Sequence, residues 1–155
     1  MGEYDDSGQP PHVAASGLLV TNTAGLTLLV ANPYREGLVL PGGVIETGES
    51  PADAAARECR EEVGLDLPVG RLLAVQHKPL GPRQESGLVF VFDTDPVPDD
   101  VALTLQADEI IAVHWLPPTE AVERHTAAGQ TRLAAAFRAR DTGRTAYLDA
   151  DRSLL

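Results

Sequence analysis

The stretch GVIETGESPADAAARECREEVGL, Gly43 to Leu65, decides the expected fold of this chain. It predicts a helix, because Ser50 is a good N-cap, Pro51 suits the first helical turn and Gly64 can end the helix. Between these ends the chain is rich in alanine and other residues that favour helices. The residues expected on its buried side are Ala52, Ala55, Ala56, Cys59 and Val63.

Three glutamates occupy the opposite side of this predicted helix. Glu58, Glu61 and Glu62 stand at positions i, i+3 and i+4, so their carboxylates share one patch of surface. Two like charges so placed repel by roughly 0.2–0.5 kcal/mol, and a hard divalent cation would reverse that sign because it binds carboxylate oxygens. The simpler interpretation is a solvated acidic face in which Arg57 pairs with Glu61, four residues on.

The sequence before the helix favours the cation. Leu40-Pro41-Gly42-Gly43 follows a predicted strand, and paired glycines let the backbone adopt positive φ and approach a ligand closely. With Glu49, Arg57 and the helix glutamates, this stretch fills every position of the pattern G-x5-E-x7-R-E-U-x-E-E-x-G-U, where U is a bulky apolar residue. Cys59, at the first U, is the one unusual choice, and it is conservative because free Cys behaves as a small hydrophobe. The stretch resembles the Nudix box, the signature of the Nudix hydrolases.

The resemblance implies metal-dependent hydrolysis of a nucleoside diphosphate linked to another group, with Mg²⁺ or Mn²⁺ as the cofactor. By their positions in the motif, Glu58, Glu61 and Glu62 would bind the metal, and the Gly42 carbonyl is a candidate further ligand. Arg57 would orient these carboxylates. The physical chemistry agrees, since this reaction needs charge neutralised on the diphosphate and a water held in line.

The general base differs among members of the family, and some use a carboxylate outside the box. Glu109, six residues before Trp115, is the candidate here, with Asp108 next. The alternative for both is that they solvate a loop. His77 and His114 are poorer candidates for a base, because a single histidine lies more often at a surface or in a satisfied hydrogen bond.

The remaining sequence alternates between β-prone and helical segments. The expected strands are 12–21, 25–32, 38–40, 69–76, 87–93, 109–116 and 145–148, with the first two joined as a hairpin and Ile111, Val113 and Trp115 facing one side of the sixth. The expected late helices are 119–124 and 131–140. This order predicts an α/β (α+β) sandwich, and the resemblance implies a Nudix-type α/β/α sandwich with a central mixed β-sheet. We expect residues 1–11 to be a flexible leader and 12–155 a single Nudix hydrolase domain.

Composition limits the partners of the chain. At 155 residues with a formal net charge of −11, it lacks the basic character that duplex nucleic acid or an anionic membrane would need. The expected partner is a small nucleoside diphosphate derivative, and a homodimer stays open. A single cysteine excludes an intramolecular disulfide and favours a cytoplasmic setting, and no apolar run approaches the roughly 18–20 residues of a membrane span.

Three functions compete at this stage. The first is a Nudix pyrophosphohydrolase acting on a nucleotide triphosphate, ADP-ribose or a nucleotide sugar. The second is a sensor that binds such a ligand without cleaving it. The third, an isomerase of the isopentenyl diphosphate type, needs a catalytic cysteine outside the helix and is disfavoured because Cys59 is the only cysteine. Arg35 lies upstream of the glycines and could contact phosphate or ribose, although surface solubility also explains it.

Overall fold

The computed structural model describes residues 12–79 and 86–154, so the expected leader at 1–11 lies outside the described residues. Its elements, in chain order, are β1 (His12–Leu19), β2 (Thr27–Ala31), β3 (Gly42–Val44), α1 (Pro51–Val63), β4 (Leu72–Lys78), β5 (Ser86–Asp93), β6 (Ala112–Leu116), α2 (Pro118–Arg124), a 3₁₀ turn (Ala127–Gly129), α3 (Gln130–Thr142), β7 (Ala146–Asp149) and β8 (Arg152–Ser153).

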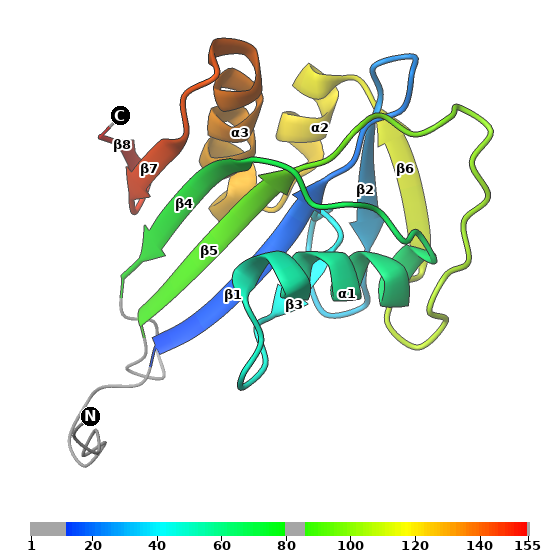
Figure 1. Ribbon diagram of the computed structural model, residues 1–155, viewed down its shortest axis with the longest axis horizontal. Helices are drawn as coiled ribbons and strands as arrows, with labels where there is room; N and C mark the ends of the chain where they lie inside the picture. The colour runs from blue at the N-terminus through cyan, green and yellow to red at the C-terminus, as the bar shows by residue number, and fades with distance from the viewer. Residues whose placement is uncertain (1–11, 80–85, 155) are drawn as a thin grey trace.

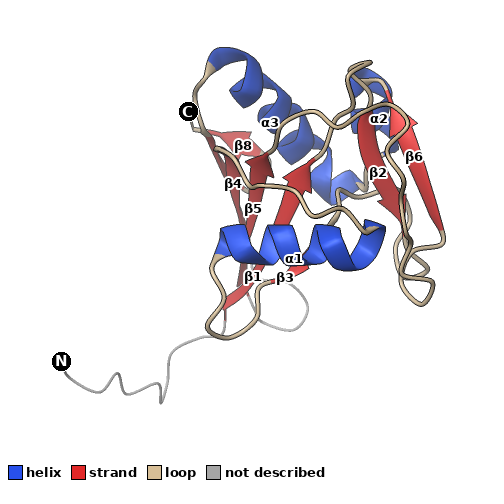
Figure 2. Ribbon diagram, turned by 45° about the vertical axis from the view of Figure 1, so that its right-hand side comes forward, coloured by secondary structure: helices blue, strands red, loops and turns tan. Residues whose placement is uncertain are grey.

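A mixed sheet forms the centre of the molecule. Its strand order is β3-β1-β5-β4-β7-β8, and β2 and β6 form a second, antiparallel pair. The β1–β5 and β4–β7 pairs are parallel, whereas β1–β3, β4–β5 and β7–β8 are antiparallel. Helix α1 lies against one face of the sheet and α3 against the other, and α2 packs beside α3 and β2 (Figures 1 and 2). The predicted α/β/α arrangement with a mixed sheet is therefore confirmed.

Two apolar clusters hold these layers together, one on each side of the sheet. Strand β1 contributes to both because its side chains alternate between faces: Leu18 packs with Cys59 of α1, and Leu19 packs with Leu133 of α3. All four of these side chains are fully or almost fully buried. The end of β1 is thus apolar on both faces, which explains why its sequence there shows no polar alternation.

Local signals explain the bounds of α1. The Ser50 hydroxyl accepts a hydrogen bond from the Asp53 N–H at 3.1 Å, and Gly64 ends the helix with φ of 75°. The predicted buried side is partly wrong, because Ala52 and Ala56 are only half-buried. The buried positions are Ala54, Ala55, Cys59, Glu62 and Val63. The buried face therefore includes one glutamate.

Three details of the predicted strands are wrong. The first two strands do not form a hairpin. One isolated bridge, Thr21 to Thr27, lies at the turn between them, and β1 and β2 then belong to different sheets. Residues 38–40 make only isolated bridges, and the strand beside β1 starts at Gly42. Ile111 is 64 % exposed because β6 begins only after it, at Ala112.

Candidate active site

Strand β3 places glycine backbone between β1 and α1. Gly42 and Gly43 pair with Gly17 and Ser16 of β1. A Cβ at Gly42 would come within 2.7 Å of the Gly17 Cα and closer still to the Ser16 carbonyl oxygen, whereas a Cβ at Gly43 would meet the carboxylate of Glu58. Neither glycine has a positive φ. Glycine is required here because β1 and Glu58 lie too close for a side chain, and not because the backbone is left-handed as expected.

Arg57 links the loop after β3 to the glutamates of α1. Its Nε and Nη2 donate to the two carboxylate oxygens of Glu49 at 2.7 and 3.0 Å. Its Nη1 donates to Glu58 Oε1 at 2.9 Å and to Glu61 Oε2 at 3.1 Å, and Nη2 also donates to the Val44 carbonyl at 3.1 Å. The Arg57–Glu61 pair of the simpler interpretation is present, but it is one contact in a network that fixes the loop against the helix.

Glu62 and Glu58 place carboxyl groups in a partly buried position. Glu62 is only 7 % exposed and accepts a hydrogen bond from the Gly42 N–H at 3.1 Å. Burial, helped by the charges of Glu58 and Glu109, raises the pKa of Glu62 to about 8, although the hydrogen bond from Gly42 acts in the opposite direction. Burial likewise raises the pKa of Glu58, although the hydrogen bond from Arg57 acts in the opposite direction. These carboxylates therefore repel one another where water screens them weakly.

Glu109 reaches this cluster because its loop is tied to the end of α1. The Thr104 N–H donates to the Val63 carbonyl at 2.9 Å, and the Gln106 N–H donates to the Glu62 carbonyl at 3.0 Å. The Glu109 N–H closes the following turn on the Gln106 carbonyl at 3.0 Å. The negative charge of Glu109 then acts on both Glu58 and Glu62. The structure thus brings together residues that are far apart in sequence.

The donor chemistry of the cluster fits a hard divalent cation. Glu58, Glu61 and Glu62 offer only oxygen ligands, and their mutual repulsion would be relieved by positive charge. Within residues 12–79 and 86–154, however, no three acidic, histidine or cysteine side chains form a ready-made metal site. Two of these carboxylates are engaged by Arg57, so they would share their oxygens with the ion. The Gly42 carbonyl as a ligand stays a prediction.

Other candidate groups have ordinary surroundings. His77 Nδ1 lies 3.4 Å from Asp149 Oδ1, so it has a partner that the sequence did not reveal, and His114 pairs with Leu29 inside the β2–β6 pair. Cys59 is fully buried, and burial raises the pKa of its thiol to about 12, which leaves it unreactive. The isomerase alternative thus loses its only cysteine.

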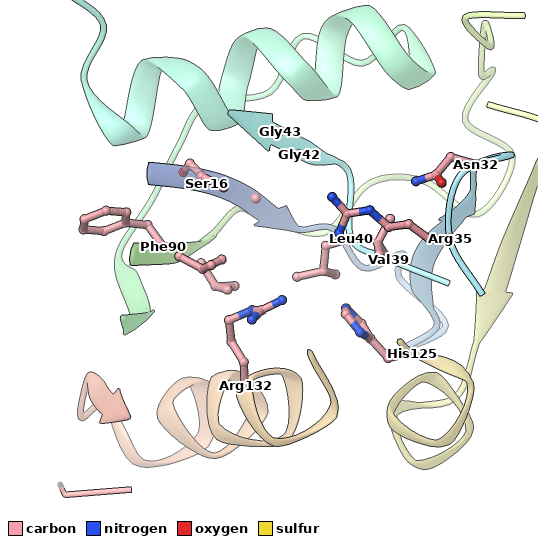
Figure 3. Close-up of a pocket in the computed structure, with 14 residues that line it drawn as sticks. Ser16, Asn32, Arg35, Val39, Leu40, Gly42, Gly43, Phe90, His125 and Arg132 are labelled. Carbon is pink, nitrogen blue, oxygen red and sulfur yellow. The ribbon is translucent and has the colours of Figure 1, made fainter. Parts of the chain in front are cut away.

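A cavity lies beside the glycine strand, and sequence reasoning missed most of its polar residues. Arg132, from the start of α3, and His125, from the end of α2, point into it together with Arg35 (Figure 3). Arg35 is exposed and lines the edge of this cavity, so its side chain can contact a ligand bound there. No motif marks Arg132 or His125. The available signal was a cationic residue next to Leu133 on the apolar side of the predicted helix at 131–140.

Comparison with known proteins identifies the family. A sequence model described as the NUDIX domain matches residues 10–137. The chain belongs to the Nudix hydrolase family. Its Nudix domain is 37 % identical over 105 residues to the CTP pyrophosphohydrolase of Escherichia coli K12, an alignment that covers 68 % of this chain and 73 % of that protein. It is 30 % identical to a MutT-like protein of Streptomyces ambofaciens, covering 80 % and 77 %.

Solved Nudix structures share the fold. The MutT protein of Methanosarcina mazei Go1 superimposes with a TM-score of 0.70 at 23 % identity, covering 86 % of this chain and 99 % of that one. The Nudix domain of Shewanella oneidensis NrtR, complexed with ADP ribose, gives 0.71 at 19 % identity, covering 90 % and 95 %. The predicted family and its enzyme class, a Nudix pyrophosphohydrolase, are confirmed. Among the described residues, none of the helices has the length and apolar character needed to cross a membrane.

Proposed function

We propose that this Nudix enzyme hydrolyses the pyrophosphate linkage of a nucleoside diphosphate derivative, namely a nucleotide triphosphate, ADP-ribose or a nucleotide sugar. The observation that carries the proposal is the pair of partly buried carboxylates, Glu58 and Glu62, held against the glycine backbone of β3. Mg²⁺ or Mn²⁺ would be held by these two residues and Glu61. Bound there, the ion would neutralise phosphate charge and make the attacking water more acidic.

Arg57 and Glu109 have separate roles in the proposed reaction. Arg57 holds the carboxylates of Glu58 and Glu61 in place through the hydrogen bonds described above. A water attacks phosphorus, the bond from phosphorus to the leaving phosphate oxygen breaks, and Glu109 accepts the proton of the water. Glu109 suits this role because its charge acts on the same cluster and, within residues 12–79 and 86–154, it has none of the arginine contacts that occupy Glu58 and Glu61.

The relatives support this class of substrate. The curated proteins similar to this chain include a CTP pyrophosphohydrolase and, over 54 % of this chain and 51 % of the relative at 36 % identity, an ADP-ribose pyrophosphatase of Methanocaldococcus jannaschii. Both names describe cleavage of a nucleotide pyrophosphate, and the two substrates differ. The choice between substrates is therefore left to experiment.

Glu62→Gln and Glu109→Gln test the proposal against the control Glu120→Gln, an exposed glutamate of α2 paired with Arg124. Phosphate release, coupled to pyrophosphatase or phosphatase, is measured with Mg²⁺ on nucleoside triphosphates, ADP-ribose and UDP-glucose. We expect Glu62→Gln to abolish turnover and Glu109→Gln to reduce kcat by about 10²–10⁴-fold, with the control unchanged. Wild-type turnover in Glu62→Gln would refute the role of the cluster. Tight binding without turnover by the wild-type protein would instead establish a sensor.

A further inference from the structure

The cavity beside β3 has apolar walls and a cationic edge. Leu40, Phe90 and Val91 line it, and Arg35 and Arg132 approach it from opposite sides (Figure 3). Among its described lining residues there is no aspartate or glutamate. In a chain of net charge −11, this is an unusual place for two arginines. An apolar cavity with charged donors and no charged acceptor fits a flat ring that carries hydrogen-bond acceptors.

Arg132 is the donor that the fold leaves available. Its Nη1 donates to Gln76 Oε1, which fixes the direction of the guanidinium, and no carboxylate among the described residues pairs with it. Burial and the charge of Arg35 lower the pKa of Arg132 to about 10, so it stays protonated at neutral pH. A guanidinium has five N–H donors in a planar fork. Most of them find no acceptor within residues 12–79 and 86–154.

Ser16 supplies a second, independent observation in the same cavity. Its side chain is 2 % exposed, lines the cavity, and has a hydroxyl without a hydrogen-bond partner among the described residues. Buried hydroxyls are normally bonded, so an orphan beside a cavity points to a ligand group. Ser16 also pairs with Gly43 across β1 and β3, which puts the cavity next to the carboxylate cluster. A group in this cavity could thus be joined to a diphosphate at that cluster.

We propose that Arg132 is a specificity-determining residue that recognises a nucleobase edge with two neighbouring acceptors, with Ser16 as a further contact. This inference rests on the proposed function, because the base must belong to the nucleotide whose diphosphate is cleaved. Phe90 is the aromatic residue among the described residues that line the cavity, so its ring is the candidate surface for packing of such a base.

Two bases present the required edge. Guanine carries N7 beside O6, and cytosine carries N3 beside O2, so a planar arginine fork can donate two parallel hydrogen bonds to either base. Adenine places an amino donor beside each of its ring acceptors N1 and N7, and uracil has an N–H between its two carbonyls. Both would leave a donor facing the guanidinium. The enzyme is therefore expected to prefer guanine or cytosine nucleotides over adenine and uracil nucleotides.

The test compares kcat/KM for GTP, CTP, ATP and UTP in the wild type, Arg132→Gln and Ser16→Ala. We expect Arg132→Gln to lower kcat/KM for the preferred base by roughly 5- to 150-fold, with ATP and UTP changing by less than about 3-fold. Arg138→Gln, an exposed arginine on the same helix, is the matched control. Ser16→Ala should weaken the preferred nucleotide without lowering the urea midpoint, since removing an unpaired hydroxyl leaves no orphan behind.

Other outcomes separate the inference from the proposed function. Equal losses for all four nucleotides in Arg132→Gln would mean that Arg132 contacts phosphate, and the inference would be wrong. A wild-type preference for ATP or UTP would also overturn it. Binding of GMP, CMP, AMP and UMP in EDTA, followed by calorimetry, needs no turnover. Arg132-dependent binding of GMP or CMP there would support the inference even if hydrolysis failed, and the two ligands distinguish guanine from cytosine.

Discussion

Gly42 and Gly43 of β3 lie against different groups, so a substitution at one should affect stability and a substitution at the other should affect catalysis. A methyl group at Gly42 would strike backbone of β1, which cannot move without breaking the β1–β3 pairing. The three atoms nearest to a methyl group at Gly43 all belong to the Glu58 carboxylate, the end of a flexible side chain that can rotate away. The second change moves a proposed metal ligand and leaves the fold intact.

We therefore expect Gly42→Ala to lower the free energy of unfolding by about 1–3 kcal/mol, and Gly43→Ala to lower kcat at least about 10-fold at nearly unchanged stability. Urea denaturation and phosphate release, measured on both variants, check this. If Gly43→Ala lost stability and kept full activity, the contact between Gly43 and Glu58 would have no functional meaning.

Single residues also show how far sequence reasoning reaches. The clustering of Arg57, Glu58, Glu61 and Glu62 was predictable because the Nudix motif fixes these residues within a short segment of one helix. Glu109 was proposed from the sequence outside that segment, and the structure places its charge beside Glu58 and Glu62. Arg132 was out of reach, since its significance depends on a cavity formed by strands far from it in sequence.

At the level of elements, the end of α1 positions the loop that carries Glu109. Gly64 has φ of 75°, and a Cβ there would come within 2.9 Å of the Thr104 side chain and 3.1 Å of its backbone nitrogen. Thr104 in turn donates to Val63, which anchors the loop to the helix. The helix cap and the candidate base are therefore mechanically connected.

Gly64→Ala should consequently impair stability and activity together. Strain at a left-handed residue costs about 1 kcal/mol, and displacement of residues 104–109 should lower kcat further by shifting Glu109. Thermal unfolding and the kinetic assay on the same preparation measure both effects. Gly143→Ala is the matched control, because Gly143 also ends a helix at φ of 75° but has nothing within 4 Å of a new Cβ. A control with equal loss of activity would contradict the connection.

Helices were easier to predict than the pairing of strands. The bounds of α1 follow from Ser50, Pro51 and Gly64, which act within one or two turns of chain. The separation of β1 and β2 into different sheets depends on partners much later in the chain, β5 for one and β6 for the other. The local sequence predicts a turn between β1 and β2, but it does not indicate that β5 and β6 are their partner strands.

At the scale of the whole molecule, Glu62 and His125 make stability depend on pH in opposite directions. The folded-state pKa of Glu62, about 8, lies above its ordinary value of 4.5, so its stabilising contribution is complete below pH 4.5 and is lost as pH rises through about 8. Burial lowers the pKa of His125 from 6.5 to about 4, so its contribution is complete above pH 6.5 and is lost as pH falls through about 4.

In EDTA, we expect Glu62→Gln to remove much of the loss of stability between pH 5 and 9, and His125→Gln to remove a loss of about 3 kcal/mol between pH 6.5 and 4. Urea titrations across this range measure both. Mg²⁺ should restore alkaline stability in the wild type and have little effect in Glu62→Gln. Parallel pH profiles for wild type and Glu62→Gln would show that Glu62 ionises without penalty.

The two borders of the central sheet have a consequence for self-association. One border is β3, with three residues, and the other is β8, with two. Strands this short offer few free amides and carbonyls, so they are poor templates for a strand from another molecule, and the sheet is protected against growth into fibrils. If two copies of this enzyme associate, they should therefore meet through side-chain surfaces and not by extending the sheet.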